Sequence, residues 1–252
     1  MKGAGTQSEP FLVDNIADFR VACAETDAYV KVIADMDCKK EKYLQWYTLT
    51  SNAIEVDFDG HMLKNPMIAE DNRFLNGQNK TILKNGKILN IYENACTHVI
   101  SNATLINTAV STELKRIKDT PFINVSAANC NFNILHNHIG WVQEMSQMFH
   151  LIELNGVNGL QDTRIEINGI VVDDIITADA STVEVRGCRI EGKVDYDSDL
   201  SMTRGAIYAV GKLRNSVIAF DLKNIGARAG IRLCENAGNT NIVRDDICIL
   251  DD

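Results

Sequence analysis

Apolar residues recur along this chain with two different periods. In residues 14–26 (DNIADFRVACAET), apolar side chains stand three and four residues apart behind Asp14 or Asn15, which are both good helix-capping residues. This segment predicts one short amphipathic helix. The following segments alternate apolar and polar residues and predict strands at 29–34, 46–49 and 53–58.

A loose repeat replaces the helical period beyond residue 58. In each unit an Asn, Asp or Gly is followed three residues later by an aliphatic or aromatic residue, and then by alternation. The units begin at Asp59, Asn85, Asn102, Asn129, Asp162, Gly187, Asn215 and Asn239. Repeats of this length, each made only of strands and turns, predict a solenoid because no single unit can bury its own apolar face.

The predicted fold is all-β, a right-handed parallel β-helix over residues 11–252 with the helix at 14–26 capping its first coil. Residues 1–10 are small and polar and predict a flexible arm. Successive coils would stack about 4.8 Å apart, with the Asn, Asp or Gly at a sharp bend. The expected inward row is Met62, Ile88, Leu105, Phe132, Ile165, Ile190, Ile218 and Ile242. A β-sandwich with similar turn residues is the alternative.

The amino-acid composition of the chain disfavours two classes of binding partner, nucleic acid and anionic membranes. The 252 residues carry 25 Lys and Arg against 34 Asp and Glu, a formal net charge of -9, so the summed field repels nucleic acid and anionic membranes. No apolar run is long enough to span a bilayer, and the first ten residues lack the apolar core of a signal peptide. The 7 Cys include no C-x-x-C pair, and we interpret them as reduced, buried thiols of a protein folded in a cytosol.

Two neighbouring repeats would place the same charged residues in register. TRIEI at 163–167 and CRIEG at 188–192 set Arg164 over Arg189 and Glu166 over Glu191. Two carboxylates about 5 Å apart match the spacing in a retaining glycosidase, and the two Arg could bind an anionic sugar. The competing interpretation is a solvated ladder in which each Glu pairs diagonally with an Arg.

An interruption of the repeat supplies a candidate interaction surface. The segment WVQEMSQMFH at 141–150 falls within the longest spacing between units, and it contains Trp141, Met145, Met148 and Phe149. Exposed aromatic and methionine side chains favour protein contacts. A small satellite core beneath a loop is the equally weighted alternative.

No segment meets the requirements of a metal site. The acidic DYDSDL at 195–200 lacks the Gly and Glu positions of a calcium loop. His136, His138 and His150 are conceivable zinc ligands, but no acidic or thiolate ligand stands at a suitable spacing. We therefore expect no metal and no cofactor.

From about residue 11 onward the chain resembles the pectin-lyase-like superfamily of right-handed parallel β-helices. The residues that carry the resemblance are the helical DNIADFRVACAET, the strand YVKVIADMD and the segment VDFDGH at 56–61. The family includes pectate and pectin lyases, polygalacturonases, and phage tailspikes and other virion proteins. The Arg and Asp motifs of the lyases and the paired Asp of the polygalacturonases do not align with this chain.

The resemblance, together with the lack of an export signal and of a catalytic motif, favours the virion members. We expect a non-enzymatic structural component of a phage or phage-like particle, such as a capsid decoration, fibre or spike protein, assembled in the host cytoplasm. Its partners would be copies of itself, for example in a trimer, other virion proteins, and conceivably a surface glycan. The alternative is a polysaccharide-binding or polysaccharide-degrading β-helix enzyme that uses Glu166, Glu191, Arg164 and Arg189.

Overall fold

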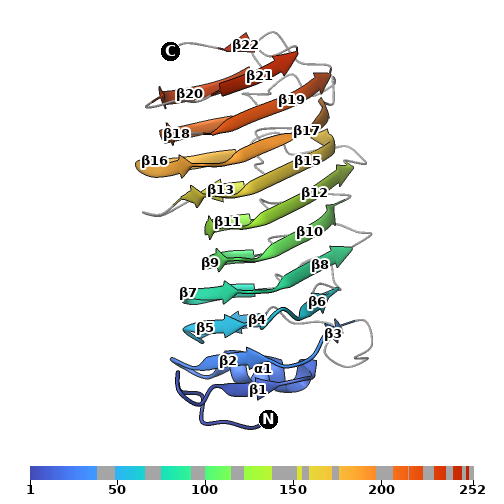
Figure 1. The fold of residues 1–252 in the computed structure, drawn as a ribbon, viewed down its shortest axis with the longest axis vertical. Helices are drawn as coiled ribbons and strands as arrows, with labels where there is room; N and C mark the ends of the chain where they lie inside the picture. The colour runs from blue at the N-terminus through green and yellow to red at the C-terminus, as the bar shows by residue number, and fades with distance from the viewer. Residues whose placement is uncertain are drawn as a thin grey trace, which may run out of the picture.

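The structure is a computed structural model that describes residues 1–38, 49–65, 75–91, 100–114, 122–137, 152–154, 159–171, 176–196, 207–214, 216–223, 230–236, 241–245 and 248–249. Over these ranges the chain is a parallel β-solenoid with one short helix near its N-terminus (Figure 1). The pairings between successive coils are parallel in both sheets. The predicted parallel β-helix is therefore confirmed, and the β-sandwich alternative is wrong.

The strands of the described residues form two sheets, and each coil contributes to both. Sheet A contains, in spatial order, β1 (Phe11–Val13), β2 (Tyr29–Val32), β5 (Glu55–Asp57), β7 (Leu75–Lys84), β9 (Ile100–Ile106), β11 (Phe122–Ala128), β13 (Ile152–Leu154), β16 (Ile176–Arg186), β18 (Ile207–Arg214), β20 (Gly230–Asn236) and β22 (Cys248–Ile249), with β4 (Leu49–Ser51) beside β7 and β14 (Leu160–Gln161) between β11 and β16. Sheet B contains β3 (Met36–Asp37), β6 (Met62–Lys64), β8 (Lys87–Ile91), β10 (Ala109–Leu114), β12 (Asn131–Asn137), β15 (Arg164–Val171), β17 (Arg189–Tyr196), β19 (Val217–Lys223) and β21 (Asn241–Asp245).

A continuous apolar column from sheet B fills the interior. Its members pair in register from coil to coil, and their side chains are at most 3% exposed: Met36, Leu63, Ile88, Val110, Phe132, Ile165 and Ile190. The same register continues through Ile218 and Ile242. Burial of this column is the main source of stability, because each fully buried aliphatic or aromatic side chain contributes about 1.5 to 3 kcal/mol.

Two members of the expected inward row lie elsewhere. Met62 is partly exposed, and Leu63 takes the inward position beside Ile88. The corner before Met62 has four residues (58–61), whereas the corresponding corner of the next coil has two (85–86), so Asp59, the second residue of its corner, does not correspond to Asn85, the first residue of the next one. Leu105 is buried, but it belongs to sheet A, where it pairs with Leu83 and Ala127 in a second apolar column.

Helix α1 (Ile16–Ala24) lies across the N-terminal end of the solenoid (Figure 1). Asn15 is its N-cap and accepts the Asp18 N–H at 2.9 Å, and the ring of Phe19 lies 6.3 Å from the ring of Phe58 in the coil above. The predicted capping helix is confirmed, with two residues fewer at each end. Within the described residues, no helix combines the length and the apolar character needed to cross a bilayer.

Residues 1–10 fold back against the first coil. The N–H of Leu12 donates to the Lys2 carbonyl at 2.8 Å in an antiparallel bridge, and the N–H of Tyr29 donates to the Gly5 carbonyl at 2.9 Å. The sequence predicted a flexible arm, whereas these contacts give the arm a defined path. The reason is that the outer edge of β1 presents backbone groups that need partners.

Candidate functional site

The turn from sheet A into sheet B is made by two residues in the four coils from β7 to β15 and in the coil of β16 and β17. The first of the two has a positive φ at Asn85 (57°), Asn107 (49°), Asn129 (51°), Asp162 (46°) and Gly187 (66°). Asn, Asp and Gly tolerate this left-handed conformation better than other residues do. The predicted bends at four of these positions are confirmed. Asn107 was missed because the repeat had been placed at Asn102, which also has a positive φ but lies within β9.

The side chains at this corner form a hydrogen-bonded ladder on the outside of the solenoid. The Nδ2 of Asn85 donates to Asp57 Oδ1 at 3.0 Å, the Nδ2 of Asn107 donates to Asn85 Oδ1 at 3.2 Å, and the Nδ2 of Asn129 donates to Asn107 Oδ1 at 2.7 Å. We call these four residues the amide ladder. It joins four successive coils by side-chain bonds, in addition to the backbone bonds of the sheets.

A second column lies on the inner side of the same corner. Its members are small and buried: Gly86, Thr108, Cys130, Thr163, Cys188 and Ser216. The hydroxyl of Thr163 donates to the Gln161 carbonyl at 2.8 Å, and the thiol of Cys188 donates in the same way to the Arg186 carbonyl at 3.3 Å. The two cysteines of the column therefore take the place of a hydroxyl residue.

The described cysteines behave as structural thiols. Cys23, Cys130 and Cys188 are buried free thiols, and Cys38 is half-buried. Burial raises the pKa of Cys130, and it raises the pKa of Cys188 to about 11. A thiol with a raised pKa is a weak nucleophile at neutral pH. The interpretation as reduced, buried thiols holds for the three buried cysteines.

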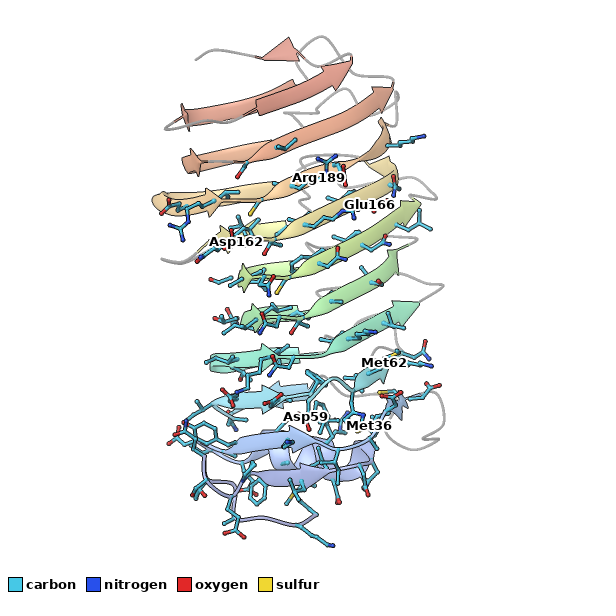
Figure 2. All side chains as sticks on the ribbon, viewed as in Figure 1. Met36, Asp59, Met62, Asp162, Glu166 and Arg189 are labelled. Carbon is cyan, nitrogen blue, oxygen red and sulfur yellow. The ribbon has the colours of Figure 1, made fainter. Side chains whose placement is uncertain are left out.

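The structure brings together the charged residues that the sequence placed in register. Arg164 pairs with Arg189 and Glu166 with Glu191 across β15 and β17. Arg164 Nη2 lies 2.8 Å from Glu191 Oε1, and Arg189 Nε donates to Glu191 Oε2 at 2.7 Å. Arg164 Nη2 also lies 3.4 Å from Glu166 Oε2. Figure 2 labels Glu166 and Arg189 on these neighbouring coils, with Asp162 at the corner that precedes β15.

The electrostatics of this charged cluster favour the ionised form of Glu191. The hydrogen bond from Arg189 lowers the pKa of Glu191, and Arg164 adds to the effect. An acid catalyst requires the opposite, a carboxyl group whose pKa is raised so that it holds a proton near neutral pH. Glu191 pairs diagonally with Arg164, as in the predicted ladder, whereas Glu166 contacts Arg164 of its own strand. The guanidinium side chains of Arg164 and Arg189 remain 53% and 56% exposed, which leaves them accessible to a ligand.

Asn168 and Gly192 belong to this part of the surface, and sequence reasoning missed both. The Nδ2 of Asn168 donates to Glu166 Oε1 at 3.1 Å, while its Oδ1 accepts the backbone N–H of Lys193 at 3.0 Å. A Cβ on Gly192 would lie 1.7 Å from the Ile167 carbonyl oxygen, so only glycine allows this close approach. An Asn opposite a Gly-Lys pair in the next repeat was the signal for this irregularity.

The remaining sequence candidates cannot be placed relative to one another, because most of them fall in segments that the structure does not describe. Trp141, Met145, Met148 and Phe149 lie outside the described residues, as do His138 and His150. In the ranges that the structure covers, no group of three or more His, Cys, Asp or Glu is arranged to hold a metal ion.

No family model, curated protein or solved structure matches this chain. What the molecule does is therefore argued from the geometry of its own residues.

Proposed function

We propose that this chain is a non-enzymatic structural component of a phage or phage-like particle, of the decoration, fibre or spike kind. We also propose that its nearest architectural relatives are the virion members of the pectin-lyase-like superfamily. The observation that carries the proposal is that side chains join neighbouring coils in three places: the interior, the corner between the sheets, and the outer face. Apolar columns join them inside, the amide ladder joins them at the corner, and the charged cluster joins β15 to β17 on the outer face.

Such multiple bonding suits a mechanical role. Each repeat of a solenoid contacts only its neighbours, so the stiffness of the rod depends on every interface between coils. The Glu191 carboxylate has hydrogen bonds from Arg164 and Arg189, one from the strand below and one from its own strand. We interpret this arrangement as a clamp between coils. The proposed partners are further copies of the chain and other virion proteins, met in the host cytoplasm during assembly.

Fractionation of the source culture tests the proposal directly. After lysis, particles are separated on a density gradient and each fraction is probed with an antibody against the purified protein. We expect the protein to sediment with particles that contain nucleic acid and to remain with them through a second gradient. Recovery only among free soluble proteins or cell debris would overturn the proposal.

A second candidate function is recognition or cleavage of an acidic polysaccharide. The observation in its favour is that Arg164 and Arg189 are both more than half exposed on neighbouring strands. Oligosaccharide release from a panel of acidic polysaccharides distinguishes cleavage from a structural role. Release that disappears in the Glu166→Gln, Glu191→Gln double variant, while circular dichroism shows the variant folded at the assay temperature, would favour the enzyme. Lys193→Gln serves as the control, because Lys193 is exposed on the same strand.

A further inference from the structure

The charged cluster on β15 and β17 holds one carboxylate beneath two guanidinium groups. The Glu191 side chain is 17% exposed, whereas the side chains of Arg164 and Arg189 are 53% and 56% exposed. Arg164 Nε donates to Glu191 Oε1 at 3.0 Å, and its Nη2 lies 2.8 Å from the same oxygen. Arg189 takes the other oxygen, because its Nε and Nη2 both lie 2.7 Å from Oε2. Glu191 therefore occupies the inner side of both arginines.

Each guanidinium group has a second edge, which carries Nη1 and which we call its outer edge. Glu191 engages only the Nε and Nη2 edge of each arginine, although a guanidinium group has five N–H donors. Within the described part of the chain, Nη1 of Arg164 and Nη1 of Arg189 have no hydrogen-bond partner. Neighbouring strands lie about 4.8 Å apart, so one ligand group can reach both outer edges.

Glu191 itself indicates which kind of group fits between the two arginines. Its carboxylate has two oxygen atoms, and each oxygen is taken by a different guanidinium group. A second group of the same kind could therefore meet the outer edges in the same way. Arginine recognises carboxylate and phosphate through such parallel N–H···O bonds.

Net charge does not account for binding here, because the two arginines and two glutamates of the cluster sum to zero. The strand positions that pair with them in the coils below and above are uncharged, namely Asn131, Asn133, Val217 and Ala219. Glu166 is the second acid of the cluster and is 38% exposed. A ligand would therefore be held by the direction of the remaining N–H groups, against some repulsion from Glu166.

The sheet is irregular beside the cluster, and such irregularities are frequent next to binding sites. The regular pairing of β15 with β17 stops at Glu166 and Glu191 and resumes at Gly169 and Val194. Between these points the Asn168 side chain accepts the backbone N–H of Lys193 and donates to Glu166. The irregularity thus fixes one acid of the cluster from the backbone, while Glu191 fixes both arginines.

We propose that the outer edges of Arg164 and Arg189 together bind one oxyanion, the carboxylate or phosphate group of an acidic glycan. Glu191 is the positioning residue that holds both guanidinium groups in place for this ligand. Ordering a long side chain during binding weakens affinity by roughly two- to tenfold. Glu191 removes that cost for two arginines, because it orders them before the ligand arrives.

This inference rests on the second candidate function, recognition of an acidic polysaccharide, and names the atoms that would carry it. Binding without release of oligosaccharides would keep the oxyanion site and remove cleavage. A chain that sediments with particles but binds no oxyanion would keep the particle role and lose this site.

Titration calorimetry of the full chain at constant ionic strength tests the site. Alginate oligosaccharides probe carboxylates, linear polyphosphate probes phosphates, and dextran is the uncharged control. We expect the native chain to bind at least one charged probe and not dextran, and the probe that binds identifies the source of the oxyanion. Arg164→Gln and Arg189→Gln should each weaken binding by about tenfold, the effect of losing a charge-assisted hydrogen bond.

Arg186→Gln is the matched control. It removes the same charge from an exposed arginine, but at the end of β16 in sheet A, so we expect binding to weaken by less than about threefold. Failure of the native chain to bind either charged probe, or equal weakening by Arg186→Gln and Arg164→Gln, would overturn the site.

The two glutamates should act in opposite directions. Glu191→Gln removes a negative charge but releases the guanidinium groups, so we expect binding to weaken by about threefold or more. Glu166→Gln removes an exposed acid of the cluster, so we expect binding to strengthen by up to about threefold. Net charge alone would make both variants bind more tightly, so tighter binding by Glu191→Gln would overturn its positioning role. Circular dichroism of each variant verifies that the solenoid is intact.

Discussion

At the corner between the two sheets, a single side chain must tolerate a positive φ and also bond to the coils above and below. Asn meets both requirements because its amide donates in one direction and accepts in the other. An ionised Asp can only accept. Asp57 therefore suits the lower end of the amide ladder, where it receives Asn85 Nδ2. Asp162 stacks above Asn129 in the same corner position but has no proton to give to Asn129 Oδ1, so the ladder ends there.

We expect Asp162→Asn to stabilise the protein. The new Nδ2 would extend the ladder to Asn129, and one intramolecular hydrogen bond contributes about 1 kcal/mol to the free energy of unfolding. Urea unfolding of both proteins measures the difference. Asp162→Ala is the control, and it should be less stable than the native chain because alanine neither bonds nor favours a positive φ. An Asn variant no more stable than the native chain would contradict the ladder account.

The raised pKa of the Cys188 thiol predicts that the free energy of unfolding falls at alkaline pH. Its pKa is raised by burial from 9.0 to about 11 in the folded chain, so between these values the unfolded state releases a proton that the folded state keeps. The folded state then binds more protons, and stability falls as the pH rises through this window. We expect Cys188→Ser to lose less stability between pH 8 and pH 10.5 than the native chain loses, as measured by urea unfolding. Ser occupies the equivalent position at Ser216, so the corner should accept it.

Among the elements, β15 and β17 show how a charged pair can stabilise neighbouring coils without being catalytic. We expect Glu191→Gln to lower the free energy of unfolding at pH 7 by roughly 0.5 to 1 kcal/mol, the range for a largely solvated ion pair. The hydrogen bond from Arg189 lowers the pKa of Glu191, so this stability is present above the usual carboxyl range and is lost as the pH falls below it. The difference between native and variant should therefore shrink from pH 7 to pH 3. A difference that grows in acid would show that Glu191 acts otherwise.

The register of these strands could be predicted from sequence because identical motifs repeat. TRIEI and CRIEG align without a gap, and the structure pairs Arg164 with Arg189 and Glu166 with Glu191 as expected. The position of Met62 could not be predicted, because the motif does not reveal that the corner before it is two residues longer than the next one. Asn102 and Asn107 both fit the repeat, and only the paired strands show that Asn107 makes the corner.

The contacts within the charged cluster also could not be predicted from the sequence. Stacked carboxylates suggested a raised pKa, but the hydrogen bond from Arg189, with a further one from Arg164, lowers the pKa of Glu191 instead. The sequence analysis also did not predict that the strand of Gly192 approaches the Ile167 carbonyl closely.

For the whole molecule, the two ends of the solenoid are the places where backbone groups lack a neighbouring coil. At the N-terminal end, α1 covers the apolar cross-section and Lys2 bridges to Leu12 on the outer edge of β1. An uncovered strand edge is a template for pairing with other chains.

We therefore expect a chain without residues 1–10 to aggregate. Light scattering at a fixed temperature should rise faster for the truncated chain than for the full chain, and its melting temperature should be lower. The Thr6→Ala, Ser8→Ala double variant is the control, because it keeps the backbone of the arm while removing an exposed hydroxyl contact. Equal scattering by the truncated and full chains would show that the arm does not protect this edge.

The amide ladder repeats at a constant spacing over two coils. Gene duplication can therefore change the length of the solenoid. Asn85, Asn107 and Asn129 are separated by 22 residues each, so two consecutive coils have the same length. A tandem copy of residues 86–107 would add one more rung, about 4.8 Å, while both ends keep their present surroundings. Coils of other lengths also occur, since Asp57 and Asn85 are 28 residues apart, so the 22-residue unit is the step that reproduces the spacing of these two coils. The length of the solenoid can thus increase by one whole coil at a time through gene duplication.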